Sequence, residues 1–214
     1  MRALALLMVA SIVALCSGGA RAETEGPVSA VVRTPKGYRV VWNESKAHFT
    51  LDLPGQDLRP SNLEGFAFFV DERLIQILVV ELGDFAAGET SAKTVLDRHM
   101  QYELKHWQSN LGMPMPSTVH AQGPSQEKTH LLWEIRWPEQ IVQKTKAEGG
   151  RPAIKQLFLS ALAGDRVVVV SRTVLDGEDE GAALQYVQAV AQTLVVKDAR
   201  IDIEAVQRQI RGEP

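Results

Sequence analysis

Two histidines and a glutamate are spaced so that they could bind a metal ion from one helix. His99, Glu103 and His106 are separated by four and three residues, which places them along one side of a helix. Two imidazoles and a carboxylate can bind zinc or another divalent ion and leave a fourth position open. However, His99 and His106 lie two turns apart, about 10 Å along the helix axis. The alternative is therefore that the three residues border the buried face of the helix.

Three tryptophans and one acidic run could also bind a ligand or a cation. The tryptophans are Trp107, Trp133 and Trp137. They could stack on a small molecule, although such residues more often complete a hydrophobic core. The run Glu178-Asp179-Glu180 could attract a cation, or it could precede a helix, where negative charge is favoured. A small-ligand or divalent-metal binding protein is therefore one alternative function.

The sequence contains none of the common motifs of hydrolases and nucleotide enzymes. It lacks the Gly-x-Ser-x-Gly elbow, the His-Glu-x-x-His pair, the Walker loop and Gly-x-Gly-x-x-Gly. Ser125 and Lys128 match Ser-x-x-Lys, but the companion motifs of penicillin-recognising enzymes are missing and the segment is predicted to be extended. His120 and His130 fall near predicted strands. We therefore predict a protein that is not an enzyme and has no cofactor. A hydrolase whose catalytic residues are scattered along the sequence is the second alternative.

The composition is that of a folded domain without a nucleic-acid partner. The chain has 214 residues, 45% of them hydrophobic and 23% charged, with a formal net charge of -3. These values exclude a disordered or multi-spanning membrane protein. A nucleic-acid binding protein usually carries a basic face, and the sequence has no basic surplus.

Residues 1–22 have the pattern of a cleaved secretory signal. Arg2 precedes an apolar run from Ala3 to Leu15, and Ala20-Arg21-Ala22 is an A-x-A cleavage site. We expect an exported protein, in a bacterial periplasm, without a transmembrane segment in the mature chain. Acylation of Cys16, which would give a lipoprotein, is the alternative, but the bulky Leu15 before it is atypical. Cleavage after Ala22 leaves a chain without cysteine, and hence without a disulfide.

The remaining sequence predicts one α+β domain over residues 38–197. Residues 23–37 are expected to be a flexible lead-in, and 198–214 an amphipathic tail. Most predicted strands are joined by hairpins, so the sheet should be mainly antiparallel, and a 20-residue helix should begin near Thr90 or Ser91. The strands 66–70 and 74–82 are apolar on both faces. A sheet of this kind is covered on both faces, which predicts a three-layer α/β/α sandwich with helices above and below.

Two segments resemble the Mog1/PsbP-like superfamily in layout. Phe49-Thr50-Leu51-Asp52-Leu53-Pro54-Gly55 is similar to a strand and turn of that superfamily. The hairpin at Gly164-Asp165-Arg166, with the closing helix 186–195, is similar to the end of that fold. The resemblance implies a non-catalytic binding or assembly module.

We therefore expect an accessory protein that binds another envelope component. The expected contact surfaces are the polar loops 56–64 and 140–151 and the C-terminal tail. On the tail, Ile203, Val206 and Ile210 form an apolar stripe that could dock on a partner or on the domain itself. Removing residues 199–214 is then expected to weaken partner binding and leave the fold intact.

Overall fold

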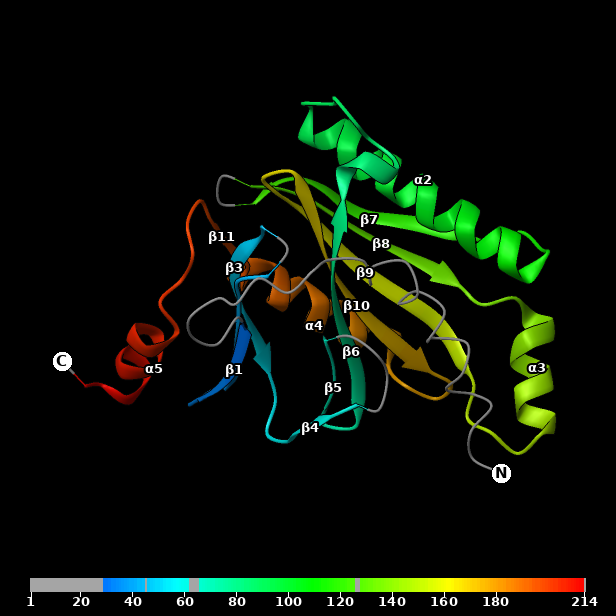
Figure 1. Cartoon of the computed structure of the whole chain (residues 1–214). Coiled ribbons are helices and arrows are strands. Elements are labelled where there is room, and N and C mark those ends of the chain that lie inside the picture. Colours follow the sequence, from blue (N-terminus) through cyan, green and yellow to red (C-terminus); the bar gives the residue numbers. More distant parts are fainter. Residues whose placement is uncertain (1–28, 45, 62–65, 126–127, 214) are drawn as a thin grey trace.

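A seven-stranded antiparallel sheet forms the centre of the molecule. The computed structural model describes residues 29–44, 46–61, 66–125 and 128–213 (Figure 1). The predicted signal segment, with Cys16, lies outside these residues. The strands of the large sheet, in spatial order, are β4 (Leu58–Pro60), β5 (Phe66–Val70), β6 (Arg73–Glu81), β10 (Arg166–Leu175), β9 (Ala153–Ala163), β8 (Lys128–Arg136) and β7 (Ser117–Ser125).

A smaller antiparallel sheet has four strands. In spatial order these are β1 (Ser29–Thr34), β2 (Gly37–Trp42), β3 (His48–Pro54) and β11 (Val195–Lys197). The helices are α2 (Ala92–Leu111), α3 (Glu139–Ala147), α4 (Glu180–Thr193) and α5 (Ile203–Arg211), with a 3-10 turn, η2 (Leu82–Asp84), after β6.

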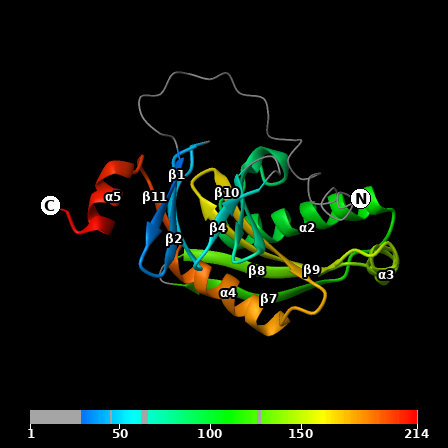
Figure 2. The same cartoon turned by 90° about the horizontal axis from the view of Figure 1, so that it is seen from below.

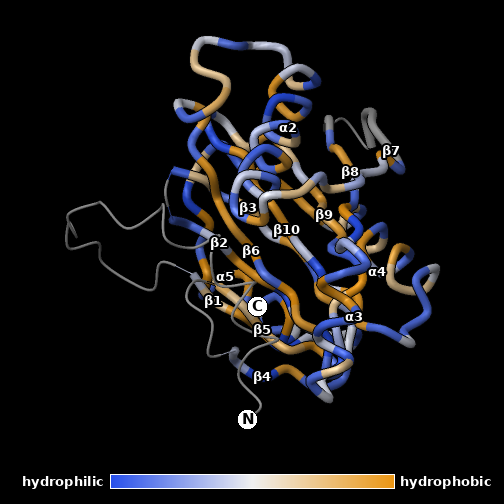
Figure 3. The backbone as a smooth tube through the Cα atoms, turned by 90° about the vertical axis from the view of Figure 1, so that its right-hand side faces the viewer, coloured by the Kyte–Doolittle hydropathy of each residue, from blue (hydrophilic) through white to orange (hydrophobic). Residues whose placement is uncertain are grey.

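The large sheet is apolar on both faces, as the sequence predicts. Along β10, Val168 and Val170 belong to one hydrophobic core, and Val167 and Val169 belong to another on the opposite face. The central strands are accordingly the most hydrophobic part of the chain in Figure 3. One core is closed by α2 and α3. The other is closed by α4 and the small sheet together.

The predicted α+β class and three-layer arrangement are confirmed, with one difference in the outer layers. The sequence predicts helices on both faces, whereas one outer layer is part helix and part sheet. Helix α4 contacts β3 of the small sheet as well as β9 and β10 of the large one (Figure 2). Leu51 and Leu53 of β3 point into this shared core and are fully buried. The small sheet therefore takes the place that a second helix would have on this face.

Two segments differ from the sequence prediction. Residues 29–34, predicted as part of a flexible lead-in, form β1, which pairs along its whole length with β2. Its β-branched residues explain the strand, although the flanking prolines suggest a linker. The segment 140–152, predicted as a polar connection, contains α3, with Val142 as its buried residue. Packing against the core makes this segment helical. Its sequence has no visible helical period, because a single buried residue cannot give one.

Turn and cap positions follow the prediction closely. The Ser91 side chain accepts a hydrogen bond from the Thr94 N–H at 3.4 Å, and α2 ends at Gly112 with a φ of 65°. The β5–β6 turn is formed by Asp71 and Glu72, both at positive φ (47° and 65°). Two consecutive residues at positive φ match the twist of a two-residue hairpin turn, so this turn fixes the register of β5 and β6.

The C-terminal tail is part of the domain. Figures 1 and 2 both place α5 on the side of the small sheet that faces away from the large sheet. Asn43 holds the segment before α5 through two hydrogen bonds to the backbone of Ile201, at 2.9 and 2.8 Å. On this outer side, Val41 is fully buried and Ile203 is 5% exposed. Within the described residues, no helix combines the length and apolar composition that crossing a membrane requires.

Candidate functional site

The predicted metal ligands on α2 do not come together. His99 is fully buried, and its Nε2 lies 3.8 Å from Glu103 Oε1. His106 instead pairs with Asn110, with 2.9 Å between His106 Nε2 and Asn110 Nδ2. Among the described residues, no three His, Cys, Asp or Glu side chains are close enough to hold a metal ion. The spacing over two helical turns separates the histidines, so the predicted three-ligand site is not formed.

His99 takes part in a buried chain of polar contacts that resembles a hydrolase triad in composition. Ser160 Oγ accepts a hydrogen bond from Trp133 Nε1 at 3.2 Å and lies 3.4 Å from His99 Nδ1. The other ring nitrogen of His99 faces Glu103. However, Ser160 and His99 are both fully buried. A substrate cannot reach this serine, so the chain satisfies polar groups in the core and does not form a hydrolase site.

Burial shifts the pKa values of both titratable members of this chain. It lowers the pKa of His99 to about 4 and raises the pKa of Glu103 to about 7. Both shifts come from desolvation, which disfavours the charged form of each group. At neutral pH His99 is therefore uncharged, and this state agrees with the hydroxyl of Ser160 donating to its Nδ1.

A second polar chain lies on the opposite face of the large sheet. His120 Nε2 contacts Glu134 at 2.8 Å, and Glu134 contacts Lys155 at 2.8 Å. Lys155 also contacts Glu180 at 2.7 Å, and Glu180 contacts Arg136 at 2.9 Å. The hydrogen bond from Lys155 is the main reason why the pKa of Glu180 is lowered. These charges join β7, β8 and β9 to the first turn of α4, which is a structural role.

The tryptophans and the acidic run are also engaged within the fold. Trp133 stacks on Phe158 with 4.2 Å between ring centroids, and Trp107 packs edge-on against Trp137 at 5.3 Å. All three tryptophans are buried. In the acidic run, Asp179 caps α4 by accepting from the Ala182 N–H at 3.0 Å. The core and cap interpretations of these residues therefore fit the geometry better than the ligand interpretations.

The Ser-x-x-Lys segment is not on a helix. Ser125 ends β7, Lys128 begins β8, and the two are cross-strand partners at the end of this hairpin. A nucleophile and its lysine on successive turns of one helix are therefore not present here.

A shallow groove between β1 and α5 combines apolar and charged side chains in an open position. We call it the β1–α5 groove, and its volume is about 360 Å³. Its lining residues are Val31, Val32, Arg33, Gln207, Ile210 and Arg211. Strand β1 forms one wall and α5 the other, so the groove exists because the tail folds back on the small sheet. Of the predicted tail residues, Ile210 lines the groove, Val206 is half-buried, and Ile203 is buried against the domain.

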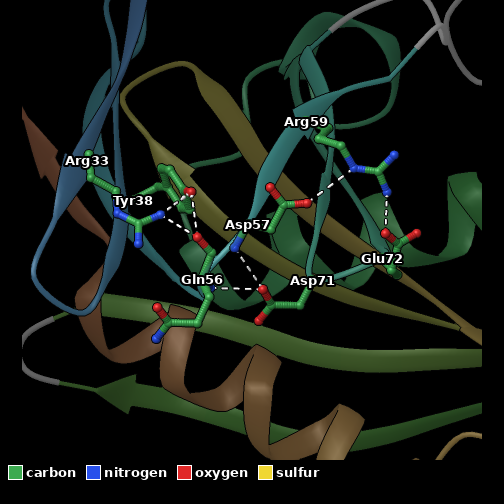
Figure 4. Close-up of polar contacts among 7 residues, drawn as sticks. All are labelled: Arg33, Tyr38, Gln56, Asp57, Arg59, Asp71 and Glu72. Carbon is green, nitrogen blue, oxygen red and sulfur yellow. Dashed lines mark hydrogen bonds and ion pairs between the residues drawn. The ribbon is translucent and has the colours of Figure 1, made fainter.

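The guanidinium of Arg33 is held in place by Tyr38 of β2 and by the backbone of Gln56, which follows β3 (Figure 4). Its Nη1 donates to the hydroxyl of Tyr38 and to the backbone carbonyl of Gln56. The Tyr38 hydroxyl donates to the same carbonyl at 2.9 Å. The guanidinium also lies over the Tyr38 ring, 4.6 Å from its centroid. Arg33 is exposed but fixed, so its remaining N–H groups are oriented before any ligand arrives.

The Gln56 carbonyl is positioned in turn by Asp71. Asp71 Oδ1 accepts from the N–H groups of Gln56 at 2.8 Å and Asp57 at 2.9 Å (Figure 4). The pKa of Asp71 is held below its usual value. The main cause is the hydrogen bond from the Asp57 N–H, and the bond from Gln56 and the nearby charges of Arg73 and Arg33 add to it. The β5–β6 turn of the large sheet therefore fixes the loop that holds the arginine of the small sheet.

The groove is basic on a chain that is acidic overall. The β1–β2 hairpin, residues 29–42, contains Arg33, Lys36 and Arg39 and no acidic residue. The opposite wall carries Arg211, whose side chain is 58% exposed and contacts Glu213 at 3.1 Å. Sequence reasoning missed Arg33 and Arg211 because they lie near opposite ends of the chain. The available signal was the charge of the hairpin beside the predicted amphipathic tail.

No protein-family model matches the chain, and no curated protein matches its sequence. Among solved structures, the chain is similar to the solution structure of cyanobacterial PsbP from Synechocystis sp. PCC 6803, with 9% identity and a TM-score of 0.47. The match covers 83% of this chain and 98% of that chain.

Proposed function

We propose that this chain is an exported, non-enzymatic accessory protein that binds another component of the bacterial envelope. The single observation that supports this proposal best is the β1–α5 groove, which is lined by three apolar side chains and by Arg33 and Arg211. Open surfaces of this kind, with a few fixed polar groups, bind partners more often than they perform chemistry. Export rests on the signal pattern of residues 1–22.

The other groups with catalytic potential support the same proposal. The side chains of Ser160 and His99 are inside the core, and Lys155 lies between two carboxylates. Ser160 Oγ, His99 Nδ1 and Lys155 Nζ each contact side chains from neighbouring elements of the fold. The groove differs because its two arginines face solvent.

The test is capture of partners by the mature protein, residues 23–214, from cross-linked envelope extract. The variant R33Q/R211Q removes both charges from the groove and keeps hydrogen-bond donors in place. The matched control, K105Q/K144Q, removes two exposed charges from α2 and α3. We expect at least one reproducible envelope protein to be captured by the wild type and the control, and to be reduced about tenfold by R33Q/R211Q, a loss typical of one or two charged contacts.

Two results would contradict the proposal. If R33Q/R211Q captures the same proteins at the same level, the groove is not the contact surface. If the wild type captures nothing above the background of an unrelated protein, the accessory role itself is wrong. Far-ultraviolet circular dichroism of each variant checks that the fold is retained.

A further inference from the structure

Within the described residues, strand β1 is an edge strand of the small sheet and has neither a bulge nor a proline. In the small sheet it pairs with β2 on one side, and α5, which borders it, is a helix and cannot continue the ladder. The unpaired N–H and C=O groups of an edge strand form a template for another strand. β1 has six residues, no proline and a register without a bulge.

The other edge strands described by the structure are each protected. β4 and β11 have three residues each, β4 contains Pro60, and β11 ends in Lys197. β7 is interrupted by a bulge at His120 and contains Pro124. Short length, proline, lysine and bulges are the features by which natural sheets prevent edge-to-edge pairing. β1 has none of these four features. Its edge is bordered instead by the open β1–α5 groove, with Arg33 on β1 and Arg211 on α5, so the charges beside the groove decide which segment could enter it.

The charges beside β1 select the kind of segment that could pair there. Arg33 extends from β1 itself, and Arg211 extends from the facing helix. Within the described part of the chain, Tyr38 and Gln56 engage Nη1 of Arg33, and no hydrogen bond is formed by the other N–H groups of the guanidinium, which can meet a ligand. A planar guanidinium with fixed orientation binds carboxylates through paired hydrogen bonds. A segment with carboxylates is therefore attracted, whereas a basic segment is repelled.

We infer that the β1–α5 groove takes an extended acidic polypeptide segment, which adds to β1 as a fifth strand of the small sheet. This inference rests on the proposed function, and it names the class of ligand and the binding mode. Alternate side chains of an added strand face the same side. On the side of α5 they would meet Ile210 and Val32, which accept apolar side chains. The preferred ligand thus combines β-branched or aromatic residues with Asp or Glu.

The test is selection from a display library of random decapeptides on the immobilised mature protein. We expect the enriched peptides to carry Asp or Glu together with β-forming residues. Their Kd should rise about tenfold or more on R33Q/R211Q, and change less than twofold on K105Q/K144Q. Two versions of an enriched peptide are N-methylated, one at its odd and one at its even positions. In one of the two versions the methyl groups replace the N–H groups that bond to β1, so its binding should weaken by a similar factor although the side chains are unchanged. Binding should also slow amide exchange in β1.

Several outcomes would overturn the inference. They are peptides without an acidic bias, equal affinity for R33Q/R211Q, no effect of N-methylation in either register, or no enriched peptide at all. Self-association of the protein through β1, seen by analytical ultracentrifugation, would assign the edge to a second copy instead. Each outcome is separable from the proposed function, because envelope capture that depends on Arg33 and Arg211 would still support the accessory role.

Discussion

At the scale of single residues, Glu103 makes stability depend on pH. Its pKa is raised by burial to about 7, whereas an unfolded chain would give about 4.5. The folded state therefore binds more protons than the unfolded state between these values, and stability falls as pH rises through them. Buried His99 acts in the opposite sense, since its pKa is lowered from 6.5 to about 4. Its effect is a rise in stability with pH over that window.

The substitution E103Q isolates the glutamate from all other titrating groups. We expect the free energy of unfolding of E103Q, relative to wild type, to increase by ~2 kcal/mol between pH 5 and pH 8, because the variant has no carboxylate to ionise in the core. The difference between the two proteins removes the contributions of titrating groups that do not contact Glu103, and the window from pH 5 to pH 8 lies above the lowered pKa of His99. Urea denaturation at several pH values measures it. The exposed Glu148 gives the control E148Q, and a flat difference for both variants would show that Glu103 is solvated.

A second prediction at this scale concerns Asp71, which connects the large sheet to Arg33. In D71A the N–H groups of Gln56 and Asp57 lose their acceptor, and a position at positive φ loses a residue type that tolerates it. We expect the free energy of unfolding to fall by about 1–3 kcal/mol. The affinity of the groove for an acidic peptide should fall as well. D71N keeps an acceptor oxygen and the turn, so it should remain close to wild type in both measurements.

At the scale of elements, the sequence predicts those features that depend on neighbouring residues alone, such as helix caps. The cap at Ser91 follows from residue type, because a serine side chain can accept a hydrogen bond from the first turn of a helix, and the sequence predicts it. Helix α3 was missed because one buried contact, Val142, holds it to the core. β1 was missed because Pro27 and Pro35 flank its β-branched residues. In both cases the deciding contact comes from a distant part of the chain.

The groove could not be predicted in the same way. Its walls are β1 and α5, the first and last elements of the described chain, and no local pattern says that they meet. The predicted stripe on the tail was correct as a helix face, but the direction in which it docks depends on Val41 and Asn43. These residues give no sign of that role in the sequence alone.

The docking of α5 leads to a prediction about the tail. Removing residues 199–214 would remove the buried Ile203 and the two hydrogen bonds between Asn43 and the backbone of Ile201. We expect the truncated protein to lose about 2–4 kcal/mol of stability. This contrasts with the expectation from sequence that the fold would be unaffected. Thermal denaturation measures the loss, and an unchanged melting temperature would show that α5 is only loosely attached.

The substitution N43A offers a milder form of the same test. It removes two hydrogen bonds to Ile201 and leaves α5 itself intact. Amide exchange in residues 201–211 should become faster, while exchange in β9 and β10 should be unchanged. Equal acceleration in both places would indicate that Asn43 supports the whole domain and not the tail.

At the scale of the whole molecule, the two sheets share one hydrophobic core but differ in what else they contribute. The large sheet, with a second core under α2, carries most of the buried side chains. The small sheet contributes one face to the shared core and offers its outer edge to the groove. This division explains why the polar networks lie around the large sheet, whereas the open basic surface lies on the small one.

Export is the property of the whole molecule that the accessory role requires, and it can be tested directly. If residues 1–22 are a cleaved signal, expression of the full chain in a bacterium should yield a periplasmic protein that begins at Glu23, as read by mass spectrometry of the N-terminal peptide. Replacing Ala22 by Arg should block this cleavage, because the A-x-A site requires a small residue. C16S should have no effect on it. Retention of an acylated chain that begins at Cys16, and its loss in C16S, would instead make the protein a lipoprotein.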